Sequence, residues 1–285
     1  MEKYWETQKA LHLYLVMNKN PLVSILINNY NKERYCVKSV QSVIFQDYKK
    51  IEIIFYDDGS SDLSLNKILN LKKKYPKKIK IIRNKNRGNI YSFNQIDAIK
   101  KSISKSKGKI ICILDSDDWF KKNKIKKVVN FFTKNKKQEI LFDRPIYSFE
   151  NNNFKKSKLD YRKRHDKWPC FPPTSCISLR KKSLKKIIHK ISNKKFPDLW
   201  FDFRLASFFA IKKDQFHILD EYLTFYRQTS DGFEKNYNKF VNLKWWKRRN
   251  QAFNFMLFLD RKNYNKYKSL DFFITKLIYR IISIF

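Results

Sequence analysis

Three acidic residues stand directly after a run of apolar residues near the middle of the chain. The apolar run is Ile110-Ile111-Cys112-Ile113-Leu114, and the polar segment that follows it is Asp115-Ser116-Asp117-Asp118. Carboxylates this close together repel one another unless a cation joins them. Mg²⁺ or Mn²⁺ suits such a segment, because these hard ions bind one or two carboxylates together with phosphate oxygens. A single aspartate here would be explained as a helix N-cap, but three acids after a buried strand favour a metal site.

A second acid-rich segment, Asp57-Asp58-Gly59-Ser60-Ser61-Asp62, follows the apolar run that ends at Tyr56. The Asp-Gly pair is typical of a tight turn, and Ser61 or Asp62 is a suitable cap for the next helix. In combination with the first segment, Asp58 becomes a candidate for a hydrogen bond to a nucleobase. Both acidic segments interrupt a chain that is otherwise strongly basic.

The elements that must position these segments alternate between strand and helix. Apolar runs predict strands at 23–27, 51–56, 79–82 and 109–114, and helical spacing predicts helices at 35–44, 63–75, 90–103 and 122–132. This order, with short connections, predicts an α/β fold with a mostly parallel sheet flanked by helices. Ligands of such sheets bind outside the carboxyl ends of the strands. We therefore expect segments 28–31, 57–62 and 115–118 to converge at one edge.

The alternation weakens after residue 138. Strands are predicted at 139–142 and 175–179, and helices at 182–191, 198–210, 243–259 and 270–285. A Lys- and Asn-rich segment, 151–167, is predicted to be a loop. The chain therefore ends in a helical extension.

The composition is that of a folded but very basic protein. Of its 285 residues 42% are apolar, and 63 Lys and Arg against 26 Asp and Glu give a net charge of +37. Such a charge attracts polyanions, anionic lipid or anionic small molecules, although a compositional bias toward Lys, Asn and Ile explains it equally well. The four cysteines form no C-x-x-C pair, which argues against zinc and fits a reducing cytoplasm. The N-terminus does not match a signal peptide and no stretch reaches 18 apolar residues, so we expect no membrane span.

These features together resemble the family-2 glycosyltransferases of the GT-A fold, and residues 21 to 132 carry most of the resemblance. The matching features, in order, are the strand and turn from Val23 to Asn31, Gln46-Asp47-Tyr48 before Ile51, Asp57-Asp58-Gly59-Ser60, Asn86-Arg87-Gly88 with Asn94, and Asp115-Ser116-Asp117-Asp118. The resemblance implies a Rossmann-like sheet and an enzyme that moves a sugar from a nucleotide-sugar donor, with UDP as the expected nucleotide. It implies Mg²⁺ or Mn²⁺ as cofactor, and a glycan or lipid-linked acceptor in the synthesis of cell-surface polysaccharide or lipopolysaccharide.

The resemblance also implies roles for individual residues in binding the donor. Asn29 and Asp58 match positions that contact the base, and Gly88 belongs to the donor site. Two departures leave the identity of the base open: Asn28-Asn29 stands where Pro-Thr is usual, and Ser92-Phe93 stands where Ala-Arg is common.

The diphosphate and the metal are implied to lie at the other acidic segment. Asp115 and Asp117 match the D-x-D element, which binds the ribose and the metal, and Asp118 adjoins it as a further metal ligand. Arg227, in Leu223-Thr224-Phe225-Tyr226-Arg227-Gln228, matches an arginine that can meet the donor diphosphate, and arginine suits bidentate phosphate contact. The alternative is a surface arginine after a strand.

Transfer with inversion needs a general base that deprotonates the acceptor hydroxyl. In the family this is an acid at the start of a late helix that precedes an Arg-Leu pair, which is Arg204-Leu205 here. Alignment on this pair places Asp198 at the usual acid, and Asp202 lies one helical turn further along the same face. We expect Asp198 to be the base and keep Asp202 as the second candidate; an N-cap or an ion-pair role is the alternative for each. Trp168 is a candidate for stacking on an acceptor sugar or for the core.

The resemblance divides the chain into an N-terminal extension (1–20), a catalytic domain (21–230, with a donor half 21–135 and an acceptor half 136–230) and a helical C-terminal segment (231–285). The tail from Ser269 to Phe285 is amphipathic, with Lys276 and Arg280 on its polar face. It is too short and polar to span a membrane but suits a helix that lies in the membrane interface. The alternative is that its apolar face packs on the catalytic domain. We therefore expect a cytoplasmic protein, peripheral at the inner face of the cell membrane, with an anionic membrane surface as partner.

Two other functions compete with this hypothesis. A basic nucleic-acid-binding protein fits the charge, but no helix-turn-helix, zinc or RRM signature is present, and acidic loops without a metal would repel phosphate. We therefore expect no nucleic-acid partner. The other competitor is a catalytically inactive homologue that only binds sugar nucleotides.

Overall fold

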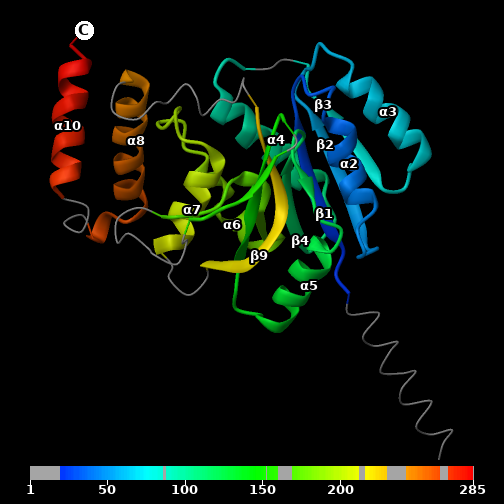
Figure 1. Cartoon of the computed structure of the whole chain (residues 1–285). Helices are drawn as coiled ribbons and strands as arrows, with labels where there is room; N and C mark the ends of the chain where they lie inside the picture. The colour runs from blue at the N-terminus through cyan, green and yellow to red at the C-terminus, as the bar shows by residue number, and fades with distance from the viewer. Residues whose placement is uncertain are drawn as a thin grey trace, which may run out of the picture.

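In the computed structural model, four parallel strands form the first half of a single sheet (Figure 1). The structure describes residues 20–85, 88–151, 153–159, 169–211, 216–229, 242–263 and 269–284. Trp168, the Asn86-Arg87 pair, most of the predicted N-terminal extension and the greater part of the predicted loop 151–167 lie outside the described residues. The strands are β1 (Val23–Asn29), β2 (Ile51–Asp57), β3 (Ile79–Arg83) and β4 (Ile110–Asp115).

The spatial order β3-β2-β1-β4 places the first strand between the second and the fourth. The register pairs Asn28 of β1 with Tyr56 of β2 on one side and with Asp115 of β4 on the other. The carboxyl ends of three strands therefore lie in one row, as the sequence predicts. The helices that connect the strands are α2 (Cys36–Ile44), α3 (Ser64–Lys74) and α4 (Tyr91–Lys105), and α5 (Lys124–Lys134) follows β4.

The second half of the chain extends the same sheet. The strands are β5 (Trp119–Phe120), β6 (Ile140–Phe149), β7 (Phe154–Lys156), β8 (Ile177–Arg180) and β9 (Phe216–Gln228). Strand β8 pairs antiparallel with β4 and with β6, β9 runs parallel to β6, and β5 closes the edge against β9. The long strand β9 lies outside the strand predictions, since its alternation is interrupted by Asp220 and Glu221. A 3₁₀ turn, η1 (Thr174–Cys176), and the helices α6 (Lys181–Ile191) and α7 (Phe201–Ile211) complete this half.

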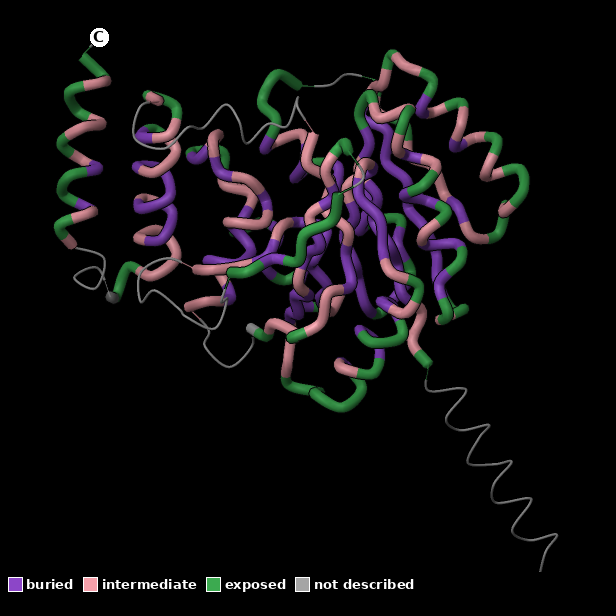
Figure 2. The backbone as a smooth tube through the Cα atoms, in the orientation of Figure 1, coloured by how far each residue is buried: buried purple, intermediate pink, exposed green. Residues whose placement is uncertain are grey.

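The hydrophobic core has two layers, one on each face of the sheet. Successive residues of β1 alternate between them, because side chains of a strand point to opposite faces. Ile25 and Ile27 face α2, α3 and α5, whereas Leu26 faces α4, α6 and α7. The central strands are buried on both faces, which is why they read as continuous apolar runs (Figure 2).

Two further helices, α8 (Leu243–Leu259) and α10 (Leu270–Ile282), stand side by side at the edge of the molecule, and a 3₁₀ turn, η4 (Arg261–Asn263), follows α8 (Figure 1). Phe255 of α8 packs into the core layer that contains α7. On its other side, Phe253 meets Phe272 of α10 edge to face at 5.3 Å, and Arg249 forms an ion pair with Asp271. Within the described ranges, no helix is both long enough and apolar enough to span a bilayer.

Candidate functional site

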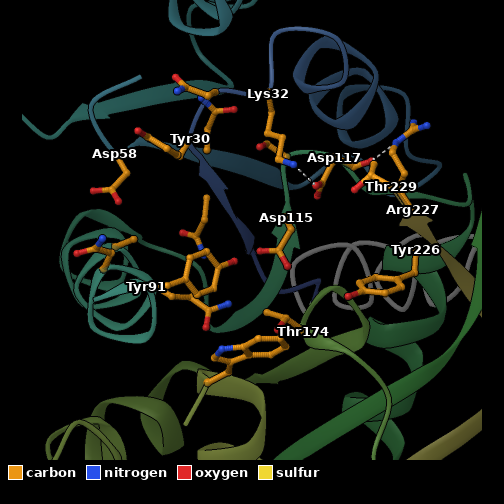
Figure 3. A pocket seen from close by; sticks show the side chains of 18 of the residues that line it. Tyr30, Lys32, Asp58, Tyr91, Asp115, Asp117, Thr174, Tyr226, Arg227 and Thr229 are labelled. Carbon is orange, nitrogen blue, oxygen red and sulfur yellow. Dashed lines mark hydrogen bonds and ion pairs between the residues drawn. The ribbon is translucent and has the colours of Figure 1, made fainter. Parts of the chain in front are cut away.

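A cavity of about 750 Å³ opens at the carboxyl ends of β1, β2 and β4 (Figure 3). Its volume lies within the range of about 300–1,000 Å³ that small-molecule sites occupy. All three segments that were expected to converge contribute to it. The residues that line it from these segments are Asn28, Asn29, Tyr30, Asn31, Asp58, Asp115, Ser116 and Asp117. The polar edge predicted from the sequence is therefore one continuous surface.

The three aspartates after β4 do not share one role. Asp115 and Asp117 line the cavity, whereas Asp118 is 2% exposed and does not line it. The Ser175 hydroxyl donates to Asp118 Oδ2 at 2.6 Å, and the backbone N–H of Arg227 donates to Asp118 Oδ1 at 2.7 Å. Asp118 thus ties the acidic segment to η1 and to the end of β9. Burial, together with the carboxylates of Asp117 and Asp115, raises its pKa well above the usual value.

The two aspartates that face the cavity crowd negative charge into a small space. Burial raises the pKa of Asp115 to about 8, and the carboxylates of Asp117 and Asp202 add to the effect. Only Lys32 opposes it among the causes of this shift. Acidic neighbours disfavour the ionised form of such a carboxyl group. A bound cation would offset this repulsion, because it attracts the ionised carboxylates.

The residues present fit a divalent ion whose remaining ligands come from a substrate. Within the part of the chain that the structure describes, no group of three or more His, Cys, Asp or Glu side chains is arranged to hold a metal. Two carboxylates, however, are what Mg²⁺ commonly takes from the protein when phosphate oxygens and water complete its shell. Asp115 and Asp117 supply this pair.

Lys32 is a cation in the cavity that sequence reasoning missed. Its Nζ lies 2.9 Å from Asp117 Oδ2, and its side chain lines the cavity beside the acidic segment (Figure 3). The residue before it, Asn31, has a φ of 50°, a left-handed conformation that asparagine tolerates better than most residues. In a chain with 63 lysines and arginines, one lysine in a turn gives no signal of its own.

Arg227 reaches the cavity from the end of β9. Its guanidinium carbon lies 4.2 Å from the centre of the Tyr35 ring and 5.0 Å from that of Trp119, so two aromatic rings hold it. Its Nε donates to the Asp117 carbonyl at 2.9 Å. The predicted diphosphate arginine therefore lies beside the acidic segment, about a hundred residues away in the sequence.

The predicted base-contacting residues lie at the other end of the cavity. Asp58 lines it and accepts a hydrogen bond from Asn84 at 2.8 Å. The Asn29 side chain is buried and donates to the Asp57 carboxylate at 2.9 Å and to Ser64 Oγ at 3.0 Å, so its amide nitrogen holds the turn after β2. The neighbouring Asn28 also lines the cavity, and both polar atoms of its amide are buried with no hydrogen-bond partner among the described residues.

Gly88 borders the cavity only through Asn94. The Asn94 amide donates to the Gly88 carbonyl at 2.6 Å, and Asn94, but not Gly88, lines the cavity. A Cβ at Gly88 would lie 2.8 Å from Asn94 Oδ1, so a side chain there would displace Asn94.

The structure places the two candidate bases in different surroundings. Asp198 does not line the cavity: Gln251 of α8 donates to its Oδ2 at 2.6 Å and accepts from its backbone N–H at 2.9 Å. Asp202, in the first turn of α7, lines the cavity. Burial raises the pKa of Asp202, while the positive charge of Arg248 and hydrogen bonds, including one from Thr174, oppose this.

Aromatic side chains form the wall near Asp202. Tyr91 and Trp200 line the cavity and meet edge to face at 6.2 Å, and the Arg248 guanidinium lies 4.0 Å from the centre of the Trp200 ring. Tyr226 lines the cavity on the side of β9 (Figure 3). None of these rings stands out in the sequence, since aromatic residues are frequent throughout this chain.

Comparisons with known proteins agree on one family. Residues 24–214 match the family model described as "Glycosyl transferase family 2". An uncharacterized glycosyltransferase of Nostoc sp. is 29% identical over 176 residues, which is 58% of this chain and 52% of that protein. One of Haemophilus influenzae is 37% identical over 119 residues, 42% of this chain and 35% of that protein. The chain thus spans about half or less of the length of these relatives.

Solved structures share the fold at low sequence identity. S. aureus TarS in complex with UDP-GlcNAc has a TM-score of 0.59 at 17% identity, covering 82% of this chain and 66% of that one. Mannosyltransferase PcManGT from Pyrobaculum calidifontis, in complex with GDP-Man and Mn²⁺, has a TM-score of 0.60 at 10% identity, covering 93% and 76%. The predicted α/β architecture of the GT-A type is confirmed.

Proposed function

Since this chain belongs to glycosyl transferase family 2, we propose that it transfers a sugar from a nucleotide-sugar donor to a hydroxyl group of a glycan or a lipid-linked acceptor. The observation that carries the proposal is that the carboxylates of Asp115 and Asp117 face one cavity, which the cations Lys32 and Arg227 also line. UDP is the nucleotide we expect, and cell-surface polysaccharide or lipopolysaccharide is the expected product class.

The donor lies along the carboxyl ends of the strands. Asp58 and Asn28 bind the base and the nucleoside at one end of the cavity, and Asp115 binds the ribose. The diphosphate lies between Asp117 and Arg227, whose planar guanidinium suits phosphate oxygens. Asp115 and Asp117 would hold Mg²⁺ or Mn²⁺, which would supply positive charge to neutralise the leaving diphosphate. Asp118, engaged with Ser175 and Arg227, holds the metal-binding segment in place.

Asp202 is the base in this proposal, because it lines the cavity and Asp198 does not. Its carboxylate takes the proton of the acceptor hydroxyl while the oxygen attacks the anomeric carbon. The bond from that carbon to the diphosphate oxygen breaks on the opposite face, so the configuration inverts. A raised pKa brings the basicity of Asp202 closer to neutral pH, where a general base is most effective. Tyr91 and Trp200 offer apolar ring faces to the acceptor sugar.

A direct test is the thermal stability of the full chain with UDP, GDP or a single-stranded oligonucleotide, each with and without Mn²⁺. We expect stabilisation by one nucleoside diphosphate that depends on Mn²⁺; at a hundredfold excess over Kd this is about 2.7 kcal/mol. Asp117→Asn should remove the Mn²⁺ dependence without unfolding the protein. Stabilisation by the oligonucleotide alone would overturn the proposal in favour of a nucleic-acid-binding protein.

We also propose that the protein lies at the inner face of the cell membrane through α10. One face of this helix packs on α8 through Phe272 and Thr275, which are buried. The opposite face leaves large apolar side chains exposed: Leu270, Phe273, Ile274, Leu277, Ile281 and Ile284. Cations beside an anionic surface contribute about 1 kcal/mol each, and the net charge of +37 favours such a surface as the partner.

Flotation with vesicles tests this placement. The full chain should bind vesicles that contain anionic lipid, and deletion of 269–285 should release it. Because the deletion also uncovers α8, the double variant Phe273→Ser, Leu277→Ser provides a second measurement at two exposed positions. Undiminished vesicle binding by both variants would exclude α10 as the membrane contact.

A further inference from the structure

Lys32 places a cation beside Asp117, one of the two carboxylates that face the cavity. Its Nζ lies 2.9 Å from Asp117 Oδ2, and its side chain lines the same cavity as Asp115. The side chains of Lys32 and Asp117 are 27% and 24% exposed, so both reach the space that a ligand would enter. The acidic segment thus carries a counter-ion supplied by the protein.

The backbone of Lys32 is fixed, although its ammonium group stands at the end of a flexible stem. Asn31 precedes it and is held by the loop after β2, since Asn31 N–H donates to Ser60 Oγ at 3.0 Å. The Lys32 carbonyl accepts the N–H groups of Tyr35 and Cys36, each at 2.9 Å, at the start of α2. A lysine anchored in this way swings its charge through several ångströms without any movement of the main chain.

Arg227, which also contacts Asp117, has no such freedom. Two aromatic rings hold its guanidinium, and its Nε is bonded to the Asp117 carbonyl. Lys32 instead contacts the carboxylate itself, the group that a divalent ion would take. A divalent ion bound to the Asp117 carboxylate would lie close to the Lys32 ammonium and repel it. The two cations therefore cannot both bind this carboxylate at full strength.

We propose that Lys32 is an exchangeable cation: it holds Asp117 while the donor is absent, and it moves to the donor diphosphate when a divalent ion takes Asp117. This inference rests on the proposed donor site. It makes binding of the metal and the nucleotide mutually dependent, because the metal alone must displace Lys32 without offering the ammonium a new anion. With the diphosphate present, the displaced ammonium gains a charge-assisted hydrogen bond.

The test is calorimetric titration of the full chain with Mn²⁺ alone, with UDP or GDP alone, and with the nucleotide in saturating Mn²⁺. In Lys32→Met, Mn²⁺ alone should bind about threefold more tightly, the size of effect that a partly exposed ion pair has on an equilibrium. The nucleotide in saturating Mn²⁺ should bind about tenfold more weakly. Lys32→Arg should keep most of the nucleotide affinity. The matched control is Lys127→Met, which removes a surface ion pair with Glu221 at 3.1 Å, outside the cavity.

Each outcome decides the proposal. If Lys32→Met and Lys127→Met have the same affinities in both titrations, Lys32 neither competes with the metal nor binds the diphosphate, and the proposal is overturned. If nucleotide affinity falls while Mn²⁺ alone binds no more tightly, the exchange is refuted, because Lys32 then never competed with the metal. If the wild-type chain binds neither UDP nor GDP in Mn²⁺, the proposed donor site itself is wrong. This result is independent of the Lys32 variants.

Discussion

Replacing Asp202 with asparagine removes the proposed base while leaving the shape of the cavity wall unchanged. A general base in position contributes about 10²- to 10⁴-fold to the rate. At 1.36 kcal/mol per tenfold change, the barrier in Asp202→Asn should rise by about 2.7–5.4 kcal/mol. The loss should appear in kcat, with the affinity for the nucleotide nearly unchanged, because Asp202 lines the cavity near the aromatic wall, away from the proposed site of the base.

The matched control is Asp198→Asn, which lies in the turn that precedes α7 rather than in the helix predicted over 198–210. This change disturbs the hydrogen bonds with Gln251 and the contact with Lys247 Nζ at 4.0 Å, all at the interface with α8. It should cost about 1 kcal/mol of stability and leave kcat within a few fold. The assay is release of the nucleoside diphosphate from the donor in the presence of acceptor. A wild-type kcat in Asp202→Asn together with a thousandfold loss in Asp198→Asn would refute the assignment.

The pH dependence of kcat gives an independent check on the same residue. Burial raises the pKa of Asp202 and the positive charge of Arg248 lowers it. Only the ionised carboxylate accepts a proton, so activity should fall on the acid side as pH passes below this pKa. Arg248→Met removes the lowering influence, and the acid limb should therefore move to higher pH. Lys247→Met, a neighbouring loss of charge, should leave the limb in place; an unmoved limb in Arg248→Met would contradict the reasoning.

Three further changes test the parts that hold the site. Asp118→Ala leaves the Ser175 hydroxyl and a backbone N–H buried without their acceptor, so urea unfolding should show a loss of about 2–4 kcal/mol. Lys124→Met removes the ion-pair partner of the buried Asp143 carboxylate, whose Oδ1 lies 2.7 Å from Lys124 Nζ, and should lower the free energy of unfolding by about 3–5 kcal/mol. Adding Asp143→Leu should recover most of this loss. The Arg204 guanidinium is 0% exposed and donates to four backbone carbonyls at the end of α6 and in the segment before α7. Arg204→Met should therefore lower Tm by about 10 °C in calorimetry. An unchanged Tm would disprove this structural role.

The first half of the fold could be predicted because its signals are local. Strands β1, β2 and β4 are buried on both faces, so a short apolar run bounded by polar turns marks each of them without knowledge of its neighbours. The convergence of Asp58 and Asp115 also followed, since the carboxyl ends of parallel strands must meet at one edge. Strand β9 gave no such signal, because its acidic bulge is explained only by pairing with β6.

The finer geometry of the site depends on contacts between distant segments, which no local pattern contains. Asp117 and Asp118 are adjacent in the sequence. Asp117 faces the cavity, whereas the Asp118 carboxylate accepts hydrogen bonds from Ser175 and Arg227. Asp198 fits the family pattern, but its environment is set by Gln251 of α8, 53 residues away. Lys32 belongs to the site only because the turn at Asn31 directs the chain toward the acidic segment.

The bond between Asp118 and the backbone of Arg227 has a consequence for how the protein is made. Four parallel strands and their helices are complete well before residue 216 leaves the ribosome, yet the acidic turn gains its last anchor only when β9 docks beside β6. A nascent chain should therefore acquire a sheet early and a working pocket late.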